Sequence, residues 1–241
     1  MAQSFSEPGH LPKRAPGGKP APPEGLPRQR SGTTPQRHGR YPDYDVLENA
    51  EHWDEATRAV VLDRVENVPP LRFFTPEEAR TLGVFCDVVT AQDAAPRIPV
   101  LNMVDAKMHA GKLDGFRFHD MPADTETWRR VARGLDEAAG GSYADLGEDA
   151  RLELVGRFAE GKLSGGVWEE LPCSKAWGVV MRGVLAAFYS HPWAWNEIGY
   201  GGPRYPRGYM RLQVGAHEPD EGVEAFDVDP VADVAEQKGL R

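Results

Sequence analysis

Cysteine is scarce in this chain, and long apolar runs are lacking. Only Cys86 and Cys173 occur among the 241 residues, and two thiols alone cannot form a structural zinc site. Their apolar surroundings in the sequence favour two buried thiols over a disulfide bond. The most apolar stretch, residues 178–189, contains Arg182 and is shorter than the roughly 18 apolar residues typical of a membrane-spanning helix. We therefore expect no transmembrane segment.

Motifs for nucleotide binding and for nucleophilic catalysis are also missing. Neither GxxxxGK[ST] nor GxSxG occurs. The sequence GYGGPR at 199–204 has two of the three fingerprint glycines but follows a helix and a proline rather than a strand, so it lacks the setting of a dinucleotide-binding turn. Ser190 and His191 are adjacent, so their side chains point apart. The sequence predicts no catalytic and no cofactor-binding residue.

Metal-ligand patterns are weak. None of the seven histidines is paired at i, i+4, and HExxH is absent. His119 and Asp120 are neighbours, with His109 ten residues upstream, but this spacing favours solvated or hydrogen-bonded histidines over a metal site. We predict no metal site. A stand-alone helical enzyme that uses His109, His119 and nearby carboxylates stays open as an alternative.

The charge of the chain is unevenly distributed. The net charge of −9 argues against nucleic-acid binding, yet residues 1–42 carry +5 and nine of the 21 prolines. We predict a disordered basic tail over 1–44, one folded domain over 45–212 and an acidic tail over 213–241. Because no apolar segment of a signal peptide follows the first basic residues, we expect a cytoplasmic protein, with export alongside a partner left open.

Helical periodicity with capping signals runs through the folded part. Thr75 and Glu78 flank Pro76 as a capping box, and Leu82 and Cys86 follow at helical spacing. No alternating run longer than five residues indicates a strand. The sequence therefore predicts an all-α fold, an irregular bundle of about six helices. The other helices are expected at 55–65, about 99–110, 124–139, 147–160 and 174–188.

One segment, residues 188–209, combines seven aromatic side chains with glycines, prolines and arginines. It is too rich in glycine and proline for a long helix and too aromatic for a solvated loop. It either caps the bundle or faces a partner, because Trp, Tyr and Arg are enriched at interface hot spots. Stacking on a sugar is a third possibility. The candidate partner-binding residues are Trp193, Trp195, Tyr200, Arg204 and Tyr205.

The order of these segments resembles the gluconate 2-dehydrogenase subunit 3 family over roughly residues 71–212. The capped helix after Phe74 leads into a loop with an acid and prolines at 93–99. A later helix ends in the phrase FYSHP at 188–192, and Trp195 and the phrase IGY at 198–200 follow. The later phrases, FYSHP and IGY, are more specific to the family than the capped helix. Segment 45–70 and the acidic tail have no counterpart in the family pattern.

The resemblance implies a non-catalytic accessory subunit. Such subunits bind and stabilise a large FAD-dependent oxidoreductase of the glucose-methanol-choline type that oxidises a sugar or sugar acid, often together with a cytochrome subunit. The FAD is then expected in the partner and no cofactor in this chain. Many members carry a twin-arginine signal, whereas this chain has a proline-rich basic segment there. A helical scaffold with an unrelated partner stays open beside the enzyme alternative.

Overall fold

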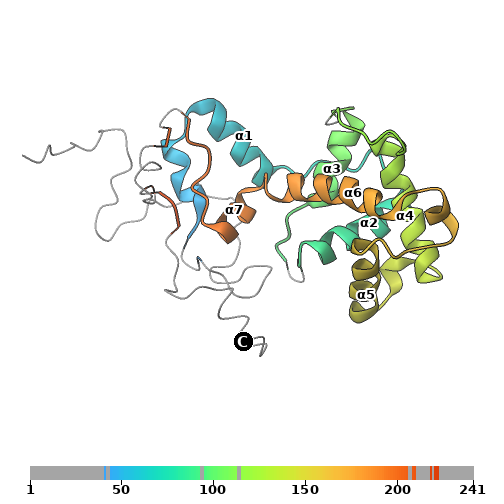
Figure 1. Cartoon of the computed structure of the whole chain (residues 1–241). Coiled ribbons are helices and arrows are strands. Elements are labelled where there is room, and N and C mark those ends of the chain that lie inside the picture. Colours follow the sequence, from blue (N-terminus) through green and yellow to red (C-terminus); the bar gives the residue numbers. More distant parts are fainter. Residues whose placement is uncertain are drawn as a thin grey trace, which may run out of the picture. The chain divides into compact units, whose positions relative to one another are not determined.

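The computed structural model describes Tyr41 and residues 44–92, 95–112, 115–205, 208–209, 218 and 220–222. This part of the chain is helical and has no strand (Figure 1), which confirms the all-α class with one α-helix more than the six expected. None of the described helices is long and apolar enough to cross a membrane. Most of the predicted tails, and Asp93 and Arg207, lie outside the described residues. The elements are η1 (Val46–His52), α1 (Glu55–Glu66), α2 (Pro76–Val89), α3 (Val100–His109), α4 (Asp124–Ala139), η2 (Tyr143–Asp145), α5 (Glu148–Ala159), η3 (Gly166–Glu169), α6 (Cys173–Phe188) and α7 (Pro192–Ile198).

The capping chemistry read from the sequence is present at α2. Thr75 Oγ1 accepts the Glu78 backbone N–H at 3.2 Å, and the Glu78 carboxylate accepts the Thr75 N–H at 2.9 Å. Helix α4 ends at Gly140, whose φ of +69° is accessible to glycine without strain. Helix α7 was not expected, because its segment is rich in glycine and proline. Pro192 stands at its first position and Gly199 at its end, so both residues bound the helix instead of interrupting it.

The described residues divide into two compact units. The terminal unit contains the residues up to Glu66 and those from His191 onward, and the core unit contains Asn67–Ser190. The sequence predicts one domain over 45–212, but the two ends of that span belong to one unit and its middle to another. In the terminal unit, η1 and α1 contact α7, as the blue and orange ribbons of Figure 1 show.

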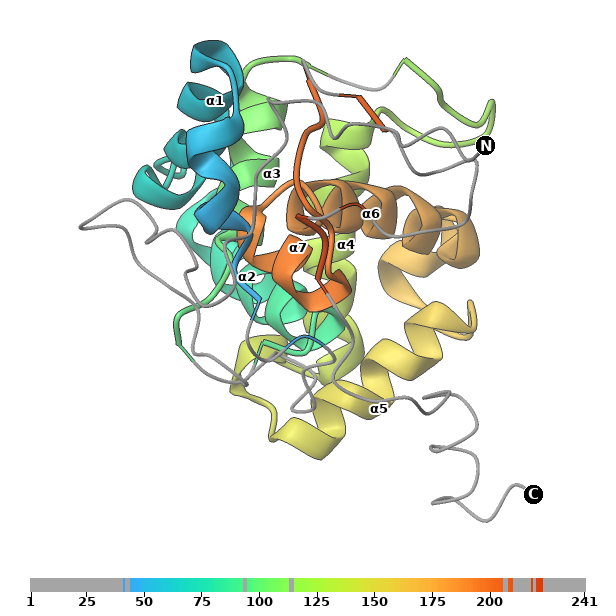
Figure 2. The same ribbon diagram turned by 90° about the vertical axis from the view of Figure 1, so that its left-hand side faces the viewer.

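Helix α6 is the centre of the core unit and contacts α3, α4 and α5 (Figure 2). The predicted stripe of α4 is correct, since Trp128, Val131, Ala132 and Leu135 are all buried. On α6, however, Leu185 was expected in the stripe and is exposed. Gly183 faces Trp128 instead, and a Cβ there would lie 2.9 Å from a ring carbon of Trp128, so a glycine allows this close approach. Cys86 and Cys173 are buried free thiols, as predicted.

A buried aspartate joins α3 to the segment before α2. Asp105 is fully buried on α3. One of its carboxylate oxygens accepts the backbone N–H of Arg72 at 2.7 Å, and the other accepts those of Phe73 and Phe74 at 2.9 and 3.0 Å. A buried carboxylate is tolerated only when hydrogen bonds of this kind compensate for its lost hydration. Asp105 therefore fixes the entry into α2.

We expect Asp105→Ala to lower the free energy of unfolding by about 3 kcal/mol, because three backbone N–H groups, that of the buried Phe74 among them, lose their carboxylate acceptor. Urea denaturation followed by circular dichroism at 222 nm measures this. The control is Glu153→Ala at an exposed position of α5, where we expect a change below about 0.5 kcal/mol. Equal midpoints for the two variants would show that Asp105 contributes no more than a surface acid.

Candidate partner-binding site

The predicted partner-binding residues all lie in the terminal unit, which joins three segments that are far apart in the sequence. The Val46 N–H donates to Asn196 Oδ1 at 2.8 Å. The Tyr44 hydroxyl donates to the Asp220 carbonyl at 2.9 Å, and the Gly222 N–H donates to the Gly199 carbonyl at 3.0 Å. The residues at the start of η1 thus have a structural role beside α7. Part of the predicted acidic tail belongs to this unit as well.

The ion pair between Arg204 and Asp220 lies at the centre of these contacts. Arg204 is 7% and Asp220 4% exposed. The Arg204 guanidinium hydrogen-bonds to the Asp220 carboxylate through Nη1 and lies 2.9 Å from the Glu221 carboxylate through Nη2. Burial disfavours the charged guanidinium, yet these two acids raise the pKa of Arg204 above its usual range. Arg204, predicted as a contact residue, is therefore engaged inside the unit.

The structure places the other four predicted residues at different depths. Trp193 and Trp195 are each only 5% exposed. The ring of Trp193 lies 4.8 Å from His191 and that of Trp195 lies 5.5 Å from Tyr200, both edge to face. Tyr200 is half-buried, whereas Tyr205 is 68% exposed. The two tryptophans thus build the interior of the unit, and partner binding by any of the five residues stays a prediction.

Two further exposed side chains were not among the predicted residues. Ile198, at the end of α7, is 50% exposed and Tyr209 is 51% exposed. Tyr209 is hydrogen-bonded to Tyr200, and the Arg204 guanidinium lies 5.2 Å from its ring centroid. Burial is the main cause that raises the pKa of Tyr200 to about 12, so its hydroxyl is neutral at physiological pH. We call Ile198, Tyr200, Tyr205 and Tyr209 the α7 surface.

His191 supports this surface by capping α7. Its Nδ1 accepts the Trp193 N–H at 3.2 Å, which leaves Nε2 to donate in the neutral ring, and the Arg64 backbone is its hydrogen-bond partner. Burial lowers the pKa of His191 to about 4, so the imidazole is neutral at pH 7. Protonation would remove the acceptor that caps the helix.

The core unit contains a cavity of about 190 Å³ between α3, α4 and α6. Its walls are mostly apolar, and Lys107, Asp124 and Arg182 also line it. Cofactor and drug-sized ligands usually occupy about 300–1,000 Å³. Within the described ranges, no three His, Cys, Asp or Glu side chains are grouped as metal ligands. His109 and His119 are exposed, and Asp120 pairs with Lys175.

In the part of the chain that the structure describes, the secondary structure is helical and an aromatic surface follows the apolar helix α6. The chain belongs to the gluconate 2-dehydrogenase subunit 3 family, because the model of that family matches residues 76–202, more than half of the chain. The predicted resemblance is thereby confirmed. No curated protein and no solved structure matches the chain. The matched range begins with α2 and ends just after α7, so it includes Trp193, Trp195 and Tyr200 of the predicted residues.

The pKa of His191 predicts a pH dependence of stability. Above pH 6.5, the ordinary pKa of histidine, His191 is neutral in both the folded and the unfolded chain, so the protein has its full stability. Below pH 6.5 His191 of the unfolded chain binds a proton, whereas His191 of the folded chain binds one only near pH 4. This lowers the free energy of unfolding by up to about 1.4 kcal/mol per pH unit.

The variant His191→Asn isolates this effect, because asparagine keeps a capping acceptor and does not titrate. Urea unfolding of both proteins at pH 7.5, 6 and 5, followed by tryptophan fluorescence, gives the comparison. We expect wild type to lose more stability than the variant toward pH 5. All other titrating groups are common to both proteins, so parallel pH profiles would contradict the assignment.

Proposed function

We propose that this chain is a non-catalytic accessory subunit that binds and stabilises a large FAD-dependent oxidoreductase of the glucose-methanol-choline type. The oxidoreductase would hold the FAD and oxidise a sugar or sugar acid. The observation that carries the proposal is the family match over residues 76–202, since the family is described as subunit 3 of a dehydrogenase. A cytochrome subunit as a further partner and a cytoplasmic location are additional parts of the proposal.

The α7 surface is the contact region that we propose for the flavoprotein. Tyrosines with exposed rings supply large contact area at a low cost in side-chain entropy and are enriched at hot spots. Tyr205 and Tyr209 are the most exposed of these rings, and Tyr200 is half-buried beside them. Trp193, Trp195 and Arg204 support the surface from inside the unit. A preorganised surface loses less freedom on binding.

Co-expression with a candidate flavoprotein of this type from the same organism tests the accessory role. We expect a yellow complex that co-purifies on a tag attached to this chain and absorbs near 450 nm. Without the chain, the yield of soluble, FAD-loaded oxidoreductase should fall. If this chain purifies alone as a monomer and the flavoprotein is equally soluble and active without it, the proposal is wrong.

The double variant Tyr205→Ala/Tyr209→Ala tests the contact region. We expect at least a roughly tenfold weaker complex, because each ring contributes a typical hot-spot energy, with an unchanged circular dichroism spectrum. The measurement is a titration of immobilised flavoprotein with wild type and variant. Leu152→Ala, which removes an equally exposed apolar side chain from α5, serves as the control and should bind as wild type does. A loss of binding equal in the two variants would place the contact elsewhere.

A further inference from the structure

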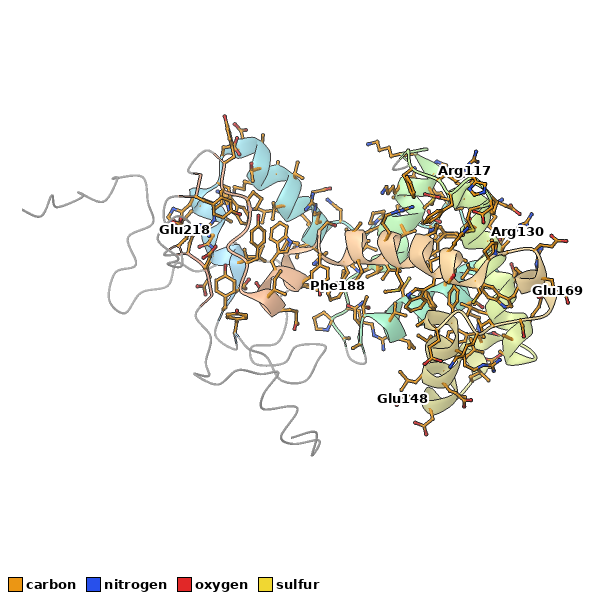
Figure 3. All side chains as sticks on the ribbon, viewed as in Figure 1. Arg117, Arg130, Glu148, Glu169, Phe188 and Glu218 are labelled. Atoms are coloured by element: carbon orange, nitrogen blue, oxygen red, sulfur yellow. The ribbon has the colours of Figure 1, made fainter. Side chains whose placement is uncertain are left out.

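Four residues of the predicted acidic tail dock on the chain just after α7. We call Glu218, Asp220, Glu221 and Gly222 the clasp. The Glu221 N–H donates to the Glu218 carbonyl at 3.1 Å, and the Glu218 N–H donates to the Glu221 carboxylate at 2.9 Å. Glu218, which Figure 3 labels in the terminal unit, is 5% exposed and Asp220 is 4% exposed. The clasp is therefore an ordered part of the terminal unit.

The clasp holds the backbone from which the α7 surface projects. The Gly222 N–H donates to the Gly199 carbonyl at 3.0 Å, one residue before Tyr200 of that surface. The Asp220 carbonyl accepts the Tyr44 hydroxyl at 2.9 Å, and the same hydroxyl lies 3.2 Å from the Tyr200 carbonyl. The backbone at Tyr200 is thus fixed from two sides by groups that the clasp positions.

The ion pair extends this dependence to the ring of Tyr209. Asp220 and Glu221 both hold the Arg204 guanidinium, which lies 5.2 Å from the ring centroid of Tyr209. An arginine that is only 7% exposed cannot stay in place without a counter-charge. Removal of the clasp is therefore expected to displace Arg204 and to take away the support of Tyr209.

The docked position of the clasp requires a glycine at 222. A Cβ at this position would lie 2.9 Å from the Cα of Gly199 and 2.7 Å from a ring carbon of Tyr41. Both separations are well below van der Waals contact. Gly222 is not among the glycines with positive φ, so space and not backbone conformation sets the requirement. A side chain at 222 is expected to push the clasp away from the end of α7.

The clasp lies outside the family match, whereas the α7 surface begins inside it. The matched residues 76–202 include Ile198 and Tyr200 but neither Tyr44 nor the clasp. A surface that starts within the family pattern is thus completed by residues that stand well after it in the chain. This arrangement makes the surface depend on a segment that contributes none of its exposed side chains.

We propose that the clasp is a conformational control of the α7 surface. The surface is formed while the clasp is docked and is lost when the clasp is released or cut off. The role of this control in partner binding rests on the proposed function, in which the α7 surface contacts the flavoprotein. Cleavage of the chain between Tyr209 and Glu218 would then switch the contact off, and only chains that contain the clasp would enter the complex.

The variant Gly222→Val in the full chain tests the control without a change of charge. Amide hydrogen exchange of the free protein is followed by mass spectrometry. We expect η1 and α7 to exchange at least tenfold faster than in wild type and α2 to α6 to be unchanged. The control is Gly141→Val, because no atom lies within 4 Å of a Cβ at that position; it should exchange as wild type does.

Unchanged exchange of α7 in Gly222→Val overturns the proposal. Equal acceleration in α2 to α6 also overturns it, because the clasp would then stabilise the whole chain and not one surface. If Gly222→Val does not fold, Asp220→Asn, which keeps the size of the side chain and removes its charge, is measured in its place with the same expectation.

A titration of immobilised flavoprotein separates this proposal from the accessory role. If wild type binds, Gly222→Val should bind at least tenfold more weakly and Gly141→Val normally. Equal binding of Gly222→Val and wild type overturns the control of the contact. If wild type does not bind, the accessory role fails, and the exchange of the free protein still decides whether the clasp controls the α7 surface.

Discussion

The buried ion pair of Arg204 with Asp220 is the constraint on which the terminal unit depends. It connects the chain after α7 to a residue sixteen positions later, and Tyr44 and Asn49 from the N-terminal segment bind the carbonyl of the same aspartate. A buried pair contributes little by itself compared with apolar packing, but loss of one partner leaves an isolated charge at a cost of about 3–5 kcal/mol. The three segments therefore stay together or separate together.

This constraint links the stability of the unit to its candidate contacts. The guanidinium that pairs with Asp220 also lies against the ring of Tyr209, and Tyr209 is bonded to Tyr200. In the core unit, Arg182 has a similar double role toward Asp124 and Phe116. In each unit an arginine held by an acid supports an exposed aromatic side chain. Such support keeps an exposed ring in place before a partner arrives, which lowers the entropic cost of binding.

The sequence predicts the long helices well, because periodicity and caps are local signals. Helix α4 and the capping box at Thr75 follow directly from spacing. The sequence does not predict helix α7. Its seven residues begin with a proline and are followed by a glycine, and so short a stretch shows no periodic pattern. The pairing of Arg204 with Asp220 and the burial of Trp193 and Trp195 are also unpredictable. An aromatic residue type suits a core and an interface equally, and contacts between distant segments leave no spacing signal.

Hydrogen exchange of the purified complex tests the central claim most directly, that this chain is a subunit whose α7 surface contacts the flavoprotein. The amide exchange of the free chain and of the chain in the complex is compared by mass spectrometry, peptide by peptide. The account predicts slower exchange in the complex for peptides that contain Ile198, Tyr200, Tyr205 and Tyr209, and unchanged exchange in α5. A stable complex in which the peptides over 198–209 exchange as fast as in the free chain would contradict it.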